Sequence, residues 1–300
     1  MESLRPGLPG VVRGDERLIS AIIIPTFNGK RQLEACLASL SWADGEDVQI
    51  VVVDSGSTDG TVRLVQKTPG VRLLTAGSEK WWAGATNVGC RFAVSELGAG
   101  VLCLLNHDCT WDERSFRSLL GGMLARPGDI HCSKVVAGTP PAILFAGGTR
   151  ARTGLLRIRG FGESVSDYLP SCDVEWCGGM GVMIPAPLWQ RLGGFDEDHF
   201  PHYYADSDFC LRAKKAGAVV RFCSDSVVTN DRASTGFSIP RQRATLRDFR
   251  LSLTSRRSPQ NVRNAVRFFS RHSGVRAPLA LAHLYALHTS MTIVRMARRK

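Results

Sequence analysis

The chain has 300 residues, of which 44% are hydrophobic and 22% charged, values that are typical of a globular protein with a substantial buried core in one large or two small domains. The nine cysteines are odd in number, form no C-x-x-C pair and lie mostly in apolar segments. This pattern excludes a disulfide framework or a cysteine zinc site and indicates reduced core thiols. Because the first residues lack the apolar run of a signal peptide, we expect a cytoplasmic protein.

The net charge of +11 is unevenly distributed. Residues 241–300 contain 14 Arg and Lys and one acid, Asp248, which gives 14 − 1 = +13 and leaves 11 − 13 = −2 for residues 1–240. Such a basic segment can contact anionic lipid headgroups or nucleic acid, or can form only a solvated surface. Few aromatic residues are interleaved with the arginines, so we expect no nucleic-acid partner.

Within this basic segment, residues 277–294 contain no formal charge over 18 positions, which is near the lower length limit for a membrane span. Two histidines, three hydroxyl side chains and Pro278 make the segment polar for a span. We therefore expect an interfacial helix that makes peripheral contact with an anionic membrane surface. Packing of this helix on the rest of the protein and a true span stay open as alternatives.

Apolar runs and amphipathic segments alternate along the first third of the chain. After an N-terminal arm that we expect to be flexible, residues 1–17, the pattern predicts strands over 18–24, 48–53, 71–74 and 101–105, and helices over about 30–40, after Gly60 and over 86–97. The unbroken β-branched runs are typical of buried parallel strands. The sequence therefore predicts an α/β fold with a mainly parallel central sheet.

Polar residues follow three of these predicted strands, namely Asn28, Asp54 and Asp108. Ligands of such sheets bind outside the carboxyl ends of the strands. The first strand is not followed by G-x-G-x-x-G, and the chain contains no G-x-x-x-x-G-K-[ST] sequence, so neither glycine-rich phosphate cradle is available. A divalent cation held by a carboxylate at the end of the fourth strand would neutralise phosphates instead.

Residues 200–212 contain a second group of polar side chains, in which an aromatic approach precedes Asp206 and Asp208 at the start of a predicted helix. Positions i and i+2 of a helix point to different faces, so the two carboxylates are expected to have different roles. One can face a cleft as a general base, whereas the other can cap backbone N–H groups or pair with a basic residue. The alternative is that both are ordinary acids favoured by the helix dipole.

Seven motifs together resemble the family 2 glycosyltransferases, inverting enzymes that use nucleotide-sugar donors. They occur in family order over residues 18–235, at 23–28, 52–61, 81–89, 104–108, 178–184, 193–197 and 204–212. The double tryptophan and the aromatic approach to the acidic motif are similar to a branch that builds bacterial surface polysaccharides, including those of cell walls, often with rhamnosyl donors. The resemblance implies a GT-A type domain over 18–240, with a nucleotide-binding half, 18–110, and an acceptor-binding half, 111–240. A basic helical extension, 241–300, follows.

The resemblance also implies roles for single residues. Asp206 corresponds to the catalytic base and Asp208 to a structural acid, whereas Asp108 corresponds to the ligand of Mg²⁺ or Mn²⁺, and Asp54 to the acceptor for the imide N–H of uracil or thymine. A helix N-cap is the alternative role for Asp54. The remaining donor-binding residues implied are Pro25, Thr26, Asn28, Trp82, Asn87 and Asn106, and the acceptor-binding residues are Trp176, Gly178, Gly179, Tyr203 and Tyr204.

The sequence departs from the family pattern at three positions. Asn106 replaces the first acid of the metal-binding motif, Ala205 replaces the Glu before the base, and Asn230 or Asp231 stands where a metal-associated His is usual. We expect an enzyme that transfers a sugar, with rhamnose as a candidate, from a dTDP- or UDP-linked donor to a glycan or lipid-linked acceptor at the inner face of the cell membrane. The alternative is a catalytically silent nucleotide-sugar-binding partner subunit.

Overall fold

The structure, a computed structural model, describes residues 18–43, 45–165, 169–231 and 244–297. The expected flexible arm, residues 1–17, lies outside the described residues. Within them, the main sheet has the strand order β10-β12-β6-β11-β4-β1-β2-β3, with β5 paired to β12 and β7 paired to β6. Six of the eight strands in this described order run in the same direction, and β10 and β11 are antiparallel to their neighbours. The sheet is therefore mixed and mostly parallel, as the strand and helix alternation predicts.

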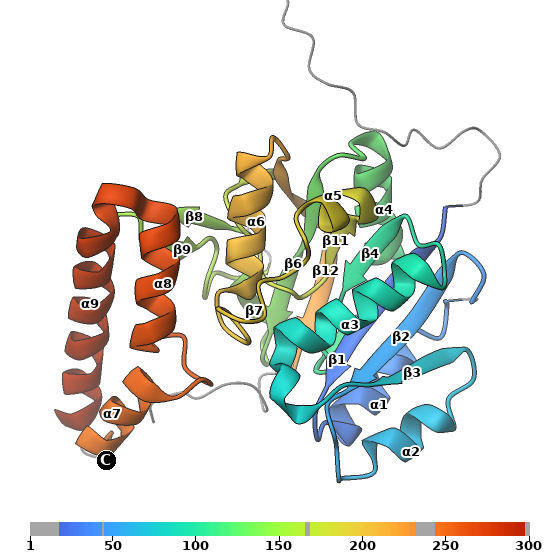
Figure 1. Ribbon diagram of the computed structural model, residues 1–300, viewed down its shortest axis with the longest axis horizontal. Coiled ribbons are helices and arrows are strands. Elements are labelled where there is room, and N and C mark those ends of the chain that lie inside the picture. The colour runs from blue at the N-terminus through green and yellow to red at the C-terminus, as the bar shows by residue number, and fades with distance from the viewer. Residues whose placement is uncertain (1–17, 44, 166–168, 232–243, 298–300) are drawn as a thin grey trace, which may run out of the picture.

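The first half of the chain forms one side of this sheet (Figure 1). Its elements are β1 (Ser20–Thr26), α1 (Lys30–Ser39), β2 (Val48–Asp54), α2 (Thr61–Gln66), β3 (Val71–Thr75), α3 (Trp81–Ser95) and β4 (Val101–Leu104). Strand β1 is buried along its whole length: Ala21 and Ile23 pack in one apolar cluster, whereas Ile22 and Ile24 pack in the other. A run of apolar residues without alternation is what a strand covered on both faces requires.

Helix α3 begins at Trp81, five residues before the predicted start at Thr86. The residues of this additional first turn, Trp81, Trp82 and Gly84, are weaker helix formers than alanine or leucine. A tertiary hydrogen bond from the Ala83 N–H to the Pro201 carbonyl, 2.9 Å long, satisfies one of the free donors of the first turn. Further along the helix, a Cβ on Gly89 would lie 2.6 Å from Ile23 Cγ2, so glycine lets α3 approach the sheet closely.

The second half extends the sheet beyond β4 and adds its helices. Its elements are β5 (Cys109–Trp111), α4 (Glu113–Ala125), β6 (Ile130–Ala137), β7 (Ala142–Phe145), β8 (Gly148–Arg150), β9 (Leu156–Ile158), β10 (Cys172–Val174), β11 (Val182–Pro185), α5 (Ala186–Arg191), α6 (Ala205–Lys215) and β12 (Val220–Asn230). Helix α6 confirms the helix predicted to start at the acidic motif, and it ends just before Gly217, after which β12 begins.

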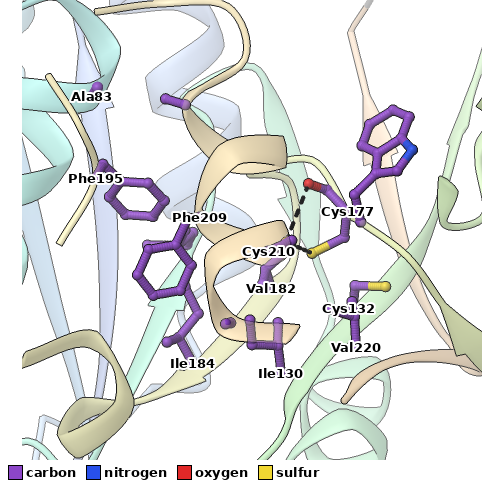
Figure 2. Packing of buried hydrophobic residues seen from close by; sticks show 14 of the residues in the cluster. Ala83, Ile130, Cys132, Cys177, Val182, Ile184, Phe195, Phe209, Cys210 and Val220 are labelled. Atoms are coloured by element: carbon purple, nitrogen blue, oxygen red, sulfur yellow. Dashed lines mark hydrogen bonds between the residues drawn. The ribbon is translucent and has the colours of Figure 1, made fainter. Parts of the chain in front are cut away.

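Two apolar clusters cover the two faces of the sheet. One cluster includes residues from α3, α5 and α6, and the other includes residues from α1, α2 and α4. Figure 2 shows Phe209 and Cys210 of α6 near Val182 and Ile184 of β11, with Phe195 on the other side of Phe209. The rings of Phe195 and Phe209 are 4.9 Å apart. All nine cysteines are free and seven are buried, which agrees with the predicted core thiols.

The C-terminal segment forms a helical layer beside α6 (Figure 1). It consists of α7 (Leu246–Thr254), α8 (Val262–Ser273) and α9 (Ala277–Ala297). Phe268 and Phe269 of α8 are buried in the same apolar cluster as α6. The two histidines of α9 face the rest of the protein, because His283 is bonded to Thr153 at 2.9 Å and His288 to Ser252 at 2.7 Å. No helix in the described part of the chain combines the length and apolarity needed to cross a bilayer.

Asp208 is the main polar link between α6 and the C-terminal helices. Its side chain is fully buried, and its carboxylate accepts hydrogen bonds from Arg212 at 2.7 Å, Arg271 at 2.9 Å and His272 Nε2 at 2.8 Å. Burial alone would raise the pKa of Asp208, but the bonds from His272, Arg212 and Arg271 lower it to about 2. A carboxylate that is fully satisfied in this way is structural, as predicted for the second acid of the motif.

We predict that Asp208→Asn destabilises the protein by about 3 kcal/mol at pH 7, because a buried ion-pair network loses its acceptor. Because the folded pKa is depressed, this difference is present above about pH 4 and disappears as the pH falls toward 2. Urea denaturation at several pH values measures it. Asp173→Asn is the matched control, since Asp173 pairs with Arg221 on the surface, and its cost should stay below about 1 kcal/mol. Equal costs for the two variants would contradict the assignment.

Candidate functional site

A cavity of about 830 Å³ opens where the carboxyl ends of β1 and β4 meet the first turns of α3 and α6. Ligand sites of open α/β sheets are expected at this edge. The expected donor-side residues Pro25, Thr26, Asn28, Trp82 and Asn106 line it together with Gly178, Gly179, Tyr203 and Asp206. The lining also includes Phe27, Ser55, Ser78, Trp81, His107, Leu144, Met180, His202, Asn230 and Arg257. Segments that are up to 230 residues apart in sequence therefore share one cavity.

Reciprocal hydrogen bonds hold the wall at the end of β1. The Asn28 N–H donates to Ser57 Oγ at 2.8 Å, and the Thr58 N–H donates to Asn28 Oδ1 at 2.8 Å. These bonds fix Asn28 in the left-handed region, with φ of 49°, a conformation that asparagine tolerates better than most residues. The loop after β2 is therefore locked to the loop after β1.

Asp54 lies directly behind this wall and is 1% exposed. Its Oδ2 accepts from the backbone N–H groups of Gly56 at 3.0 Å and Ser57 at 2.9 Å, so it caps the turn after β2. Its Oδ1 and the nearby Thr26 Oγ1 are buried without a hydrogen-bond partner among the described residues. Buried polar atoms normally have partners, and Thr26 itself lines the cavity. Asp54 thus caps the turn with Oδ2, whereas its Oδ1 accepts no hydrogen bond from the described residues.

Trp82 forms the side of the cavity between the two halves of the sheet. Its Nε1 donates to Asn106 Oδ1 at 2.8 Å, and its ring packs edge-on against Phe195 at 5.4 Å. A Cβ on Gly179 would overlap the Trp82 ring. Only glycine therefore allows the backbone after β10 to reach this tryptophan, and Gly179 sets the width of the cavity.

Asp206 lies on the floor of the cavity in the first turn of α6. Burial raises the pKa of its carboxyl to about 6, against the opposing effect of hydrogen bonds from Ser207 and the Gly179 backbone. The Ser207 N–H donates to Asp206 Oδ1 at 2.7 Å. Oδ2 would lie 3.5 Å from a Cβ placed on Gly178, so it faces the Gly178 side of the cavity. A carboxylate with a pKa near neutrality is suited to accept a proton.

Asp108, the predicted metal ligand, is 3% exposed and does not line the cavity, although its neighbours Asn106 and His107 do. Asn106 Oδ1 already accepts from Trp82, and no group of three or more His, Cys, Asp or Glu side chains in the described residues could hold a metal ion. The described residues therefore do not form a metal-binding constellation. Asp108 as a metal ligand stays a prediction, and we derive no catalytic step through a cation.

Three further residues expected at the site have side chains that do not line the cavity and that make contacts inside the protein. Asn87 is buried, donates to the Phe195 carbonyl and to Glu197, and accepts from the Phe195 N–H, so its amide supports the loop before α6. Trp176 packs on Phe145 at 5.2 Å and donates to a backbone carbonyl, which makes it a core residue. Tyr204 stacks on Phe268 at 4.7 Å and donates to the Pro259 carbonyl, so it binds the C-terminal segment.

Sequence reasoning missed Arg257, which enters the cavity from the turn between α7 and α8. It also left Trp81 and His202 undecided, and both line the cavity with their rings 6.0 Å apart. Nothing in the sequence distinguishes Arg257 from the other arginines of the basic segment. Asn230, at the end of β12, lines the cavity in place of the usual histidine, whereas the adjacent Asp231 pairs with Arg31 at 2.9 Å.

Comparison with known proteins gives a family match and several relatives. Residues 21–169 match the family model "Glycosyl transferase family 2". The chain carries a family 2 glycosyltransferase domain. A Mycobacterium tuberculosis protein named N-acetylglucosaminyl-diphospho-decaprenol L-rhamnosyltransferase is 29% identical over 72% of this chain and 77% of its own length. A hexosyltransferase of low-salt glycan biosynthesis, Agl10 of Haloferax volcanii, is 22% identical over 68% of this chain and 64% of its own length.

Solved structures show the same fold at low sequence identity. The crystal structure of GalNAc-T7 with UDP, GalNAc and Mn²⁺ superposes on this glycosyltransferase with a TM-score of 0.58 and 14% identity. The match covers 72% of this chain and 44% of that one. The fold of this glycosyltransferase is therefore GT-A-like, with C-terminal helices added.

We predict that Gly179→Ala impairs this glycosyltransferase, because the added methyl group meets the Trp82 ring and displaces it from Asn106. Overpacking of this kind costs about 1–3 kcal/mol, so thermal denaturation should show a lower melting temperature and donor binding should weaken. Gly121→Ala is the matched control, because a Cβ there meets no atom within 4 Å. A Gly179→Ala protein that matched this control in both measurements would refute the contact.

Proposed function

We propose that this glycosyltransferase moves a sugar from a dTDP- or UDP-linked donor, with rhamnose as the leading candidate, to a hydroxyl group of a lipid-linked glycan. The observation that supports this most directly is the presence of Asp206 in the same cavity as the donor-side wall of Pro25, Thr26 and Asn28. The name of the Mycobacterium tuberculosis relative, which specifies rhamnosyl transfer and a diphospho-decaprenol substrate, supports the sugar and the acceptor class.

In the proposed reaction, the acceptor hydroxyl oxygen attacks the anomeric carbon of the donor sugar. Asp206 takes the hydroxyl proton, a new C–O bond forms, and the bond between the anomeric carbon and the diphosphate oxygen breaks with its electron pair leaving on the diphosphate. A single displacement inverts the anomeric configuration. The leaving group is already activated, so the reaction needs one carboxylate base and no carboxylic acid partner of the kind that glycosidases use.

We assign donor recognition to the β1 and β2 ends of the cavity. The unpartnered Oδ1 of Asp54 is a candidate acceptor for the imide N–H of a uracil or thymine ring, which a donor base could reach only by approaching the wall formed by Thr26 and Ser55. Both bases present the same N–H group, so either nucleotide fits. Gly178, Gly179 and Tyr203, on the opposite side, are assigned to the acceptor.

The C-terminal helices support peripheral binding at an anionic membrane surface. Of the 14 large hydrophobic side chains exposed in the described residues, 10 belong to residues 246–294. On α9, Leu287, Met291 and Val294 are 48%, 54% and 51% exposed and follow the i, i+4, i+7 spacing of one helix face. Arginines surround these helices, and Asp248 is the one acid in residues 244–297. Exposed apolar side chains beside cations are typical of interfacial helices.

Asp206→Asn should lower transfer by at least about 100-fold while leaving UDP or dTDP binding nearly unchanged, because the amide cannot take a proton. In the wild type, kcat/KM should fall about tenfold per pH unit below about pH 6, since the raised pKa leaves Asp206 protonated there. A donor panel with labelled sugars measures both. Normal turnover in Asp206→Asn would refute the base, and tight donor binding by a wild type that transfers nothing would favour a silent partner subunit.

The double variant Leu287→Glu and Met291→Glu should lose most of its binding to anionic phosphatidylglycerol vesicles, because it places two negative charges on the exposed face of α9. Vesicle co-sedimentation measures the bound fraction, and circular dichroism checks the fold. Leu124→Glu provides the control, because Leu124 is 57% exposed on α4, away from these helices. If the double variant sediments with vesicles as the wild type and the control do, α9 does not contact the membrane.

A further inference from the structure

Arg257 is the one Lys or Arg among the described residues that line the cavity, and Asp206 is the one Asp or Glu. The Arg257 guanidinium lies over the Trp81 ring, 5.9 Å from its centroid. No carboxylate in the described part of the chain pairs with it. Among the described residues, the cavity is therefore lined by one cationic side chain, Arg257, which packs on an aromatic ring and has no carboxylate partner.

The turn that carries Arg257 is held from two sides. Tyr204, two residues before Asp206, donates its hydroxyl to the Pro259 carbonyl at 2.8 Å. Tyr285 of α9 donates to the Gln260 carbonyl at 3.2 Å. Tyr204 has a left-handed backbone with φ of 72°, an uncommon conformation for a residue other than glycine. These contacts fix the backbone of the turn that carries Arg257 relative to the start of α6, so the turn needs no reordering when a substrate binds.

Asn261 also holds this turn, at its junctions with α7 and α8. Its side-chain N–H groups donate to the carbonyls of Thr254 at 2.9 Å and Ser255 at 3.2 Å, at the end of α7. Its Oδ1 accepts from the Asn264 N–H at 3.0 Å, at the start of α8. One side chain thus joins the two helices on either side of Arg257 and holds the short turn between them at both ends.

A diphosphate bound in this cavity would need a positively charged side chain nearby. Burial, with a further contribution from Arg257, lowers the pKa of His202 to about 4, so this histidine is neutral at pH 7 and does not supply positive charge. An arginine presents several N–H donors in a planar fork that matches phosphate oxygens, and it stacks on aromatic rings. Arg257 on Trp81 has both properties.

We propose that Arg257 is a diphosphate-binding residue, and that the C-terminal helices thereby complete the substrate site. This inference rests on the proposed function, because it takes the ligand to be the diphosphate of a sugar-transfer substrate. Two substrates of that reaction would carry a diphosphate, the nucleotide-sugar donor and a lipid-linked acceptor. The chemistry that Arg257 recognises is the same in both.

Titration calorimetry on the full chain tests the donor diphosphate without requiring activity. The probes are UDP, dTDP, inorganic pyrophosphate and uridine, each measured with the wild type, Arg257→Ala, Arg257→Lys and Arg256→Ala. Arg256 is the adjacent arginine, which is exposed as Arg257 is but does not line the cavity. If the donor is the ligand, Arg257→Ala should bind UDP or dTDP about tenfold or more weakly, with uridine unchanged. Arg257→Lys should fall between, since lysine keeps the charge without the fork.

Transfer kinetics provide the second arm. If the lipid-linked acceptor is the ligand, Arg257→Ala should raise the KM for a diphosphate-linked acceptor about tenfold, leave UDP binding unchanged, and have little effect with an acceptor that lacks the diphosphate. Either pattern supports the proposal. Unchanged binding and unchanged KM values in Arg257→Ala would overturn it, as would equal losses for UDP and uridine, which indicate a structural role. If Asp206→Asn loses transfer while Arg257→Ala changes neither binding nor KM, the proposed function stands and this inference fails.

Discussion

The buried carboxylate of Asp208 is the interaction on which the site depends. It holds Arg212 of its own helix and both Arg271 and His272 of α8 within 2.9 Å. A buried charge is tolerated only when it is paired and hydrogen-bonded, so the three donors and the acid must be present together. Because Asp208 lies two residues after Asp206, the same turn of α6 that faces the cavity is bound to the C-terminal helices.

Because of these contacts, the C-terminal segment helps to position residues that line the cavity. Tyr204 precedes the turn that carries Asp206, and its hydroxyl donates to the Pro259 carbonyl, so the start of α6 and the Arg257 turn are fixed to each other. Phe268 stacks on Tyr204 at 4.7 Å and meets Phe200 at 6.0 Å. Aromatic packing and one buried ion cluster therefore position a carboxylate and a guanidinium, which originate 51 residues apart, around one cavity.

Helix α9 shows how a single segment can serve two environments. Its histidines and Tyr285 bond inward to the protein, whereas Leu287, Met291 and Val294 are exposed. The two histidines, which make the segment polar for a membrane span, thus help to attach it to the rest of the protein. The alternatives of packing on the domain and lying at an interface are therefore compatible, because they use different faces of one helix.

The sequence by itself determined the alternating elements, the mostly parallel sheet and the strand ends that form the donor wall. These features depend on local periodicity and on motifs whose spacing is set within one strand and its loop. The different surroundings of Asp206, which lines the cavity, and of Asp208, which lies in the buried ion cluster, were also predictable, because helical geometry separates positions i and i+2.

Only the tertiary structure decided the rest. Asn87, Trp176 and Tyr204 lie in motifs that resemble substrate-binding segments, yet their polar atoms are used inside the protein. Arg257 lies among many arginines, and its entry into the cavity depends on Tyr204, Tyr285 and Asn261, which are distant or unremarkable in the sequence. The physical reason is that sequence patterns record which face a residue occupies, whereas the partner on that face is chosen by long-range packing.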